Sequence, residues 1–183
     1  IKANTESLVL YFETTGKDDV MIDNVMITAK DPATLEVDKE TGEIGDKVEM
    51  MDISDYSIVH YLTADGASNE TSAFISMNNA AVERDSNGRN ENGFKVSERI
   101  QTYSGVALNF EDLNGKTHDV VGKNVYVGYW VYQDSGKPIQ VSATLQITQP
   151  DGKAGWPERV NKVNVPSGEW TFVEGIIPVY ANV

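Results

Sequence analysis

The sequence predicts an all-β protein, a β-sandwich of the jelly-roll kind, and three observations lead there. No stretch of twelve residues carries apolar side chains at the three-and-four spacing of an amphipathic helix. Short runs of alternating or β-branched residues recur along the chain instead. Segments rich in Gly, Asn and Asp separate these runs and are typical of turns. Many short strands joined by such turns indicate a sandwich rather than a helical or mixed fold.

The first two expected strands are residues 8–13 and 20–28. Residues 15–18, with the sequence TGKD, lie between them and predict a tight connection, so we expect the two strands to form a β-hairpin. Residues 31–45 are acidic and contain Pro32 and Gly42, and we interpret them as a linker or long loop.

The later strands follow from the same signals, and residues 139–149 show the clearest alternation. Ile, Val, Ala, Leu and Ile side chains point to one face there, and Gln, Ser and Thr side chains point to the other. Residues 85–93 (DSNGRNENG) are predicted to be a loop. The expected strands after the linker are residues 47–53, 56–62, 73–77, 80–84, 94–103, 106–110, 124–133, 139–149, 160–165 and 169–180.

Composition limits the function classes. The 183 residues suit one domain, which we expect over residues 1–183, and the start at Ile1 suggests a piece of a longer protein. The net charge of −13 argues against nucleic acid as a partner, because phosphate binding needs clustered Lys and Arg. No apolar stretch resembles a membrane span, so no membrane partner is expected. The absence of cysteine excludes disulfides and zinc–thiolate sites, and His60 and His118 are far apart in sequence.

Four motifs from residue 99 onward agree in order and spacing with one family. Residues 99–108 (RIQTYSGVAL), 124–136 (NVYVGYWVYQDSG), 147–157 (ITQPDGKAGWP) and 165–175 (VPSGEWTFVEG) carry the likeness. They resemble the carbohydrate-binding modules of families 4, 9 and 22, with family 22 closest, and the likeness covers most of residues 60–180. The resemblance implies a β-sandwich that binds a polysaccharide without cleaving it.

The closing strands of that family stand at the front of this chain. Residues 8–14 (LVLYFET) and 20–25 (VMIDNV) resemble the family's ending, which predicts a circular permutation. Residues 1–30 would be displaced terminal strands, residues 31–46 an acidic connection, and residues 47–183 the remainder of the sandwich. Two alternatives stay open: a tail left from a preceding tandem module, and a segment swapped between two chains. Pairing of residues 8–13 with the strand near 169–179 in the same chain would favour permutation.

Sugar recognition needs aromatic rings that stack on C–H faces, beside polar groups that bind hydroxyls. The resemblance implies four ligand-binding residues. Tyr103 and Trp156 would stack on sugar rings, Tyr11 would stack or hydrogen-bond, and Glu13 would accept hydrogen bonds from hydroxyls. Tyr11 and Glu13 share one strand face by period two, as a common cleft requires. An Arg of the family is replaced here by Met77 or Asn78.

The remaining aromatic and amide side chains are interpreted from the strand pattern. Trp130 and Trp170 are expected in the core, and Tyr126 and Tyr132 either in the core or in a cleft wall. Three glutamines are weaker candidates for the concave face: Gln133, Gln140 and Gln146.

The resemblance also implies a structural calcium ion held by carboxylates and backbone carbonyls, the oxygen ligands that calcium prefers. Asp23 matches the family's metal-binding Asp, and Asp65, in the turn LTADG, is the best candidate for its partner. The alternative is that Asp23 is an ordinary acid at a strand end. Residues 85–93 resemble a calcium loop in composition only, because they lack the acids of an EF-hand.

We therefore expect non-catalytic binding of a plant cell-wall polysaccharide, xylan first and mixed-linkage β-glucan second. The resemblance implies a secreted or cell-surface bacterial protein in which the module accompanies parent glycoside hydrolase domains. The alternative is a structural or adhesion sandwich without a sugar ligand. Acidic pairs such as Glu111 and Asp112 fall in no recognisable catalytic pattern, so an enzyme is not expected.

Overall fold

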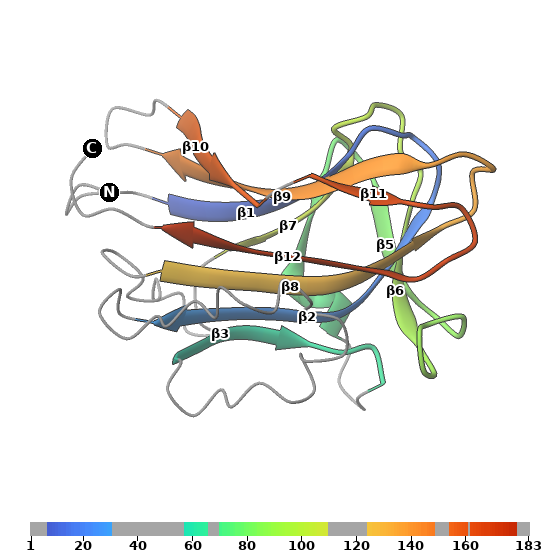
Figure 1. Cartoon of the computed structure of the whole chain (residues 1–183), viewed down its shortest axis with the longest axis horizontal. Helices are drawn as coiled ribbons and strands as arrows, with labels where there is room; N and C mark the ends of the chain where they lie inside the picture. Colours follow the sequence, from blue (N-terminus) through green and yellow to red (C-terminus); the bar gives the residue numbers. More distant parts are fainter. Residues whose placement is uncertain are drawn as a thin grey trace, which may run out of the picture.

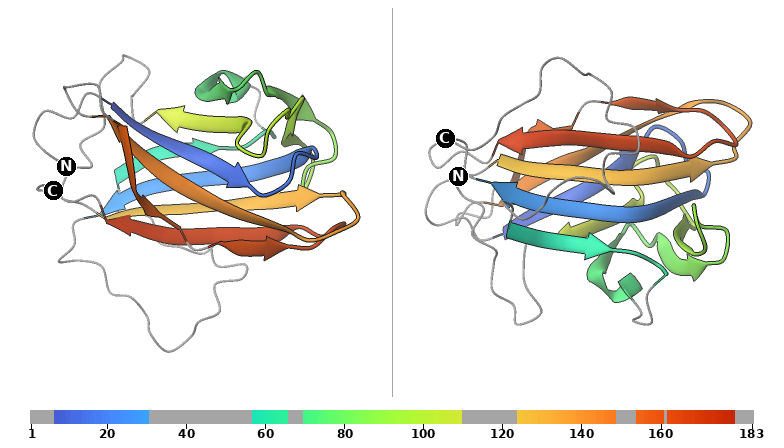
Figure 2. Two further views of the ribbon diagram at one scale, coloured as in Figure 1. Left: turned by 90° about the horizontal axis from the view of Figure 1, so that it is seen from above. Right: turned by 60° about the horizontal axis from the view of Figure 1, so that its bottom comes forward.

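The computed structural model describes residues 7–30, 57–65, 70–109, 124–148, 154–160 and 162–178. Within these ranges the chain forms β-strands and one short 3-10 helix, Glu70–Ala73. The strands make two antiparallel sheets that pack face to face (Figure 1, Figure 2). The all-β sandwich expected from the sequence is confirmed. No helix in the described part of the chain is long and apolar enough to cross a membrane.

The first sheet has the strand order β10-β9-β1-β7-β4, and β11 follows β10 along the same edge of β9. Its strands are β10 (Ala154–Arg159), β9 (Ile139–Thr148), β1 (Ser7–Thr14), β7 (Gly105–Asn109), β4 (Phe74–Met77) and β11 (Val163–Val165). Because β1 lies between β9 and β7, it is a central strand of this sheet.

The second sheet has the order β12-β8-β2-β6-β5, and β3 pairs with the later half of β2. Its strands are β12 (Thr171–Pro178), β8 (Asn124–Gln133), β2 (Val20–Lys30), β6 (Gly93–Ser97), β5 (Ala81–Asp85) and β3 (Ser57–Leu62). Strand β6 ends at Ser97, earlier than the sequence predicted, because residues 98–104 turn toward β7. The strand expected at residues 47–53 and the acidic linker lie outside the described residues.

The hairpin predicted between the first two strands is wrong. β1 pairs with β7 and β9 in the first sheet, whereas β2 pairs with β3, β6 and β8 in the second. The connection after Thr14 therefore crosses from one sheet to the other. Both strands carry apolar side chains on one face, and all four of Leu10, Phe12, Val20 and Ile22 are buried. Facing each other across the sandwich removes both faces from water, which a lone hairpin cannot do.

The strand pairing of residues 7–14 gives a mixed answer on whether the front segment is a permuted part of this sandwich. β1 does not pair with β12, whose partner is β8 over the whole register from Thr171↔Val131 to Pro178↔Asn124. Yet β1 and β2 are both central strands of sheets built from the same chain. Residues 7–30 are therefore integral to this sandwich, which argues against the tail of another module, while the circular permutation stays a prediction. β1 begins and β12 ends at the same end of the sandwich (Figure 1).

The core lies between the sheets, where alternation on β8 directs Val127, Tyr129 and Val131 inward. The Tyr129 and Phe12 rings meet edge to face, with centroids 4.8 Å apart. The expectation that Trp130 and Trp170 are core residues is wrong, since neither belongs to this cluster. β8 is apolar on both faces, so its sequence does not reveal which face is buried.

The opposite face of β8 carries a separate aromatic set. Trp130 packs on Phe172, with ring centroids 5.1 Å apart, and Tyr132 packs on Trp170 at 5.6 Å. The Arg89 guanidinium lies 3.7 Å from the centre of the Trp130 ring, a cation–π contact. Tyr126 is buried on this same outer face and donates a hydrogen bond to Glu174 at 2.7 Å. These aromatics therefore line the outside of the second sheet.

Gln133 does not line a concave face, contrary to one expectation. Its side chain is only 1% exposed. Its Nε2 donates to the carbonyls of Lys137 (2.9 Å) and Val165 (3.2 Å), and its Oε1 accepts from the Ser135 backbone N–H at 2.8 Å. Gln133 therefore closes the β8–β9 turn by satisfying buried backbone groups.

Candidate functional site

A groove hollows the outer face of the first sheet. It consists of two adjoining depressions of about 350 Å³ and about 200 Å³, and both are lined by Glu13 and Tyr103. The larger depression is also lined by Tyr11, Met77 and Asn78. Three of the four ligand-binding residues expected from the sequence, Tyr11, Glu13 and Tyr103, thus meet in one groove. Their role in ligand binding stays a prediction.

Strand alternation places the polar wall of the groove. Leu10 and Phe12 of β1 are buried in the core, so Tyr11 and Glu13 point to the other face. Tyr11 is opposite Thr144 of β9, and Glu13 is opposite Ser142 in the antiparallel register. The outward side chains of β9 therefore stand directly beside those of β1. They are Gln140, Ser142, Thr144 and Gln146.

Two side-chain hydrogen bonds connect these strands across the face. The Tyr11 hydroxyl donates to Oε1 of Gln146, and the Thr144 hydroxyl donates to Oε2 of Glu13 at 2.6 Å. Partial burial raises the pKa of Tyr11, so its hydroxyl stays protonated at neutral pH and remains a donor. The polar groups of the groove are thereby held in position before any ligand arrives.

Tyr103 rises from the turn between β6 and β7 and is 64% exposed. Backbone and hydroxyl contacts shape this turn: Ser104 N–H donates to the Gln101 carbonyl (3.0 Å), and Gln101 N–H donates to Ser104 Oγ (3.1 Å). The Asn78 amide donates to the Tyr103 carbonyl at 3.4 Å. An exposed aromatic ring on an ordered turn above a groove is suited to stacking on a sugar face.

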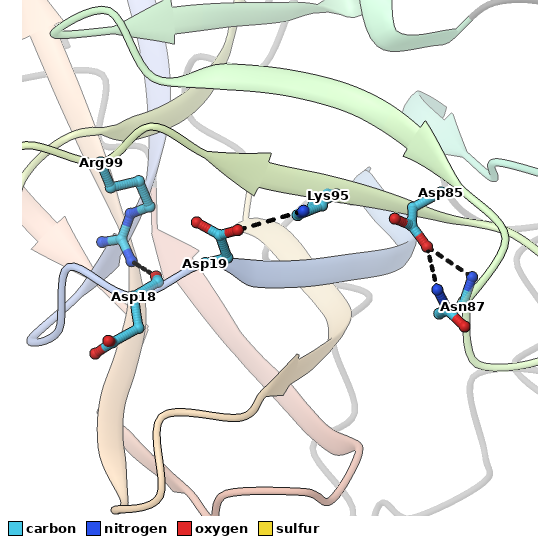
Figure 3. Close-up of polar contacts among 6 residues, drawn as sticks. All are labelled: Asp18, Asp19, Asp85, Asn87, Lys95 and Arg99. Carbon is cyan, nitrogen blue, oxygen red and sulfur yellow. Dashed lines mark hydrogen bonds and ion pairs between the residues drawn. The ribbon is translucent and has the colours of Figure 1, made fainter.

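Arg99 holds the Tyr103 turn against the β1–β2 crossing. Its side chain is buried, and its Nε donates to the Ser104 carbonyl at 2.8 Å. Nη1 donates to the Asp18 carbonyl at 2.7 Å (Figure 3), and Nη2 to the Gly16 carbonyl at 2.9 Å. Burial lowers the pKa of Arg99, and the nearby Asp18 carboxylate opposes that shift. Arg99 opens the RIQTYSG motif, yet sequence reasoning gave it no role.

Other lining residues were only partly foreseen. Met77 and Asn78, which stand where the resembling family carries an Arg, both line the larger depression, as does Gln146. Thr102 and Lys162 line the smaller depression; Thr102 belongs to the motif of residues 99–108 but was given no role, and Lys162 lies in none of the quoted motifs. Only the tertiary fold brings these segments to the groove.

The fourth expected ligand residue, Trp156, belongs to the edge strand β10. The register with β9 shifts between Gly155 and Glu158, so the backbone of Trp156 lies in an irregular stretch beside Ile147 and Leu145 of β9. Its side chain lies outside the described residues, and its stacking role stays a prediction.

The two expected metal ligands both contact the loop of residues 85–93. Asp23 accepts from Asn24 N–H (2.8 Å) and Arg89 N–H (2.9 Å), and Asp65 accepts from Asn92 N–H at 2.7 Å. Burial raises the pKa of Asp23, and the negative charge of Asp65 raises it further. Two neighbouring carboxylates with one fully buried suit a hard cation in donor chemistry. No group of three or more His, Cys, Asp or Glu gathers within the described ranges.

Comparisons with known proteins give one relative. Part of the chain is 33% identical over 78 residues to a protein named xylanase/beta-glucanase from Ruminococcus flavefaciens. The match covers 43% of this chain and 9% of that protein, so the chain corresponds to a small part of its relative. No protein-family model matches, and no solved structure matches. The match suggests a relationship to a carbohydrate-active protein.

Proposed function

We propose that the protein is a non-catalytic carbohydrate-binding module that holds a β-glycan chain in the groove of the first sheet. The observation that carries this proposal is the convergence of Tyr11, Glu13 and Tyr103 on that groove. Tyr11 and Glu13 come from residues 8–14, which resemble the closing strand of such modules, and Tyr103 comes from the motif of residues 99–108.

The groove offers the two kinds of contact that sugars use. The exposed Tyr103 ring stacks on a C–H face, while the Tyr11 hydroxyl, Gln146 amide and Glu13 carboxylate exchange hydrogen bonds with hydroxyl groups. The proposal includes Trp156, in β10, as a further stacking residue. A net charge of −13 favours a backbone of neutral sugars.

Xylan is the first candidate ligand and mixed-linkage β-glucan the second, on the family resemblance and on the relative's name. The proposal includes parent glycoside hydrolase domains in the same polypeptide and an extracellular or cell-surface location. Most glycosidases use two carboxyl groups that flank the scissile bond. Among the described residues that line the groove, Glu13 carries the only carboxylate.

Affinity electrophoresis in gels that contain xylan, β-glucan or mannan tests the proposal. The wild-type protein is expected to be retarded by at least one polymer without releasing reducing sugar. Tyr103→Ala should weaken binding by about tenfold or more, since aromatic contacts supply a large share of such affinity. Ile100→Ala is the matched control, because Ile100 is 60% exposed on the same turn and lines neither depression. Absence of retardation in all gels would favour a structural or adhesion sandwich, and sugar release would favour an enzyme.

A structural calcium ion is a second part of the proposal. Asp23 and Asp65 would hold it, and its charge would offset that of a buried carboxylate beside a second one. Added calcium is expected to raise the Tm, and a chelator to lower it, in the wild-type protein but not in Asp23→Asn. An unchanged Tm under both conditions would leave Asp23 as an ordinary strand-end acid.

Circular permutation is the third part. The central positions of β1 and β2, and the shared end at which β1 begins and β12 ends, support it (Figure 1). A variant that joins the ends of the chain and opens it within residues 31–46 should fold and bind the same polysaccharide. Loss of folding in that variant would contradict the permutation.

A further inference from the structure

The two depressions of the groove differ in chemistry. The side chains of Tyr11, Tyr103 and Met77 give the larger depression its aromatic and apolar surface, beside the amides of Asn78 and Gln146. The smaller depression is lined instead by hydroxyl, amide and ammonium groups, those of Thr14, Thr15, Thr102, Gln140, Ser142 and Lys162, beside Glu13 and Tyr103. A sugar ring that stacks in the larger depression would therefore have polar side chains of the smaller depression beside it.

Two donor residues of the smaller depression, Ser142 and Lys162, have side chains without a partner among the described residues. Ser142 is only 2% exposed and lines the depression, and its hydroxyl makes no hydrogen bond within the part of the chain that the structure describes. Lys162 is exposed and forms no ion pair among the described residues. A hydroxyl or ammonium group without a protein partner can donate to a ligand without first breaking an existing hydrogen bond. The depression therefore offers donors to an incoming acceptor.

The walls of this depression are fixed by other hydrogen bonds. Thr15 N–H donates to the Gln140 carbonyl at 2.9 Å, and Gln140 N–H donates to Thr15 Oγ1 at 2.9 Å. Arg99 holds both sides, because its Nη2 donates to Thr14 Oγ1 (2.5 Å) and to the Thr102 carbonyl (3.3 Å). Donors on such a scaffold lose little conformational freedom when a ligand binds.

We propose that the smaller depression is a subsite for a carboxylate-bearing sugar, a uronic acid substituent on the bound β-glycan, with Lys162 as its ion partner. This inference deepens the proposed function and rests on it. Ser142 and Gln140 donate to the carboxylate or the neighbouring hydroxyls. Glu13, at the junction of the depressions, repels a carboxylate and so directs it toward Lys162.

Because the chain carries a large negative net charge, the proposed subsite suits a glycan with few uronic acid substituents. A charge of −13 repels a polyuronate over long range. At physiological salt, charges separated by more than about 8 Å are largely screened, so a single uronate in contact with Lys162 interacts mainly with the local groups. The subsite is therefore suited to a mostly neutral chain with occasional acidic branches.

The test compares a glucuronic-acid-decorated xylan with the same polymer after its carboxyl groups are reduced to primary alcohols, by calorimetry in 0.15 M salt. The wild-type protein is expected to bind the acidic polymer about three- to tenfold more tightly, the range between an exposed ion pair and a charged hydrogen bond. Lys162→Ala should lose this preference for the acidic polymer. Lys162→Arg should keep the preference.

Lys137→Ala is the matched control, because it removes one exposed lysine that lines neither depression. It should retain the full preference for the acidic polymer. Equal binding of both polymers by the wild type, or a preference that survives in Lys162→Ala, would overturn the subsite while leaving the module intact. Failure of the wild type to bind either polymer would count against the proposed function itself, and the subsite would fall with it.

Discussion

Replacement of Arg99 by methionine probes the link between the scaffold and the sugar-stacking ring. Methionine keeps much of the apolar stem volume but removes every donor of the guanidinium. Arg99 donates to the carbonyls of Ser104, Asp18, Gly16 and Thr102, and so joins the β1–β2 crossing to the Tyr103 turn. The substitution should therefore lower stability and loosen the turn.

The expected loss of stability depends on how deeply the carbonyl groups that accept from Arg99 are buried. Asp18 and Thr102 are exposed, so their carbonyls regain hydrogen bonds from water when Arg99 is lost. Ser104 is buried, and an unsatisfied buried carbonyl costs about 1–3 kcal/mol. Loss of the charged hydrogen bonds lowers the free energy of unfolding further. Removal of the buried guanidinium partly offsets this loss, because a buried charge is costly. We therefore expect the free energy of unfolding to fall by about 3 kcal/mol in total.

Urea unfolding at neutral pH measures the free energy of unfolding, and calorimetry well below the transition measures polysaccharide affinity. Affinity in the folded variant should fall about tenfold, because an unheld Tyr103 turn must be ordered on binding. Arg84→Met, at an exposed arginine on β5, is the control and should change stability by less than about 0.5 kcal/mol. A stability loss with unchanged affinity would refute the positioning role of Arg99, and no stability loss would refute the reasoning from its hydrogen bonds.

Two further predictions concern the second sheet. Burial raises the pKa of Glu174 above its ordinary 4.5, so this group contributes a loss of stability as pH rises from 4.5 through the raised pKa. Glu174→Gln keeps an acceptor for the Tyr126 hydroxyl, and urea titrations across pH 4–7 should show a smaller fall in stability than in the wild type; an equal fall would contradict the assignment. A Cβ at Gly175 would lie 2.8 Å from Val160 Cβ, so Gly175→Ala should cost about 1–3 kcal/mol of unfolding free energy. Nothing lies within 4 Å of a Cβ at Gly155, and Gly155→Ala should be nearly neutral by the same urea assay; equal effects at both glycines would be against this steric argument.

The strand patterns predicted the buried face of a strand correctly where the other face meets water. In β9 the polar residues alternate strictly with apolar ones, so the sequence alone placed Gln140 and Gln146 on the face that lines the groove. In β8 both faces are apolar, and the pattern could not tell Tyr129, which is in the core, from Trp130, which is outside it. The burial of such a strand depends on what its sheet packs against.

Local sequence determined that Tyr11 and Glu13 share a face, because side chains in a strand alternate with period two. It also determined the all-β class through apolar spacing and turn residues. The tertiary structure alone decided that the chain crosses from one sheet to the other after β1. The crossing lets the apolar faces of β1 and β2 pack into one core between the sheets. The tertiary structure alone also decided that Tyr103 stands beside Tyr11 and Glu13, because strand pairing and the hydrogen bonds of Arg99 act between segments distant in sequence.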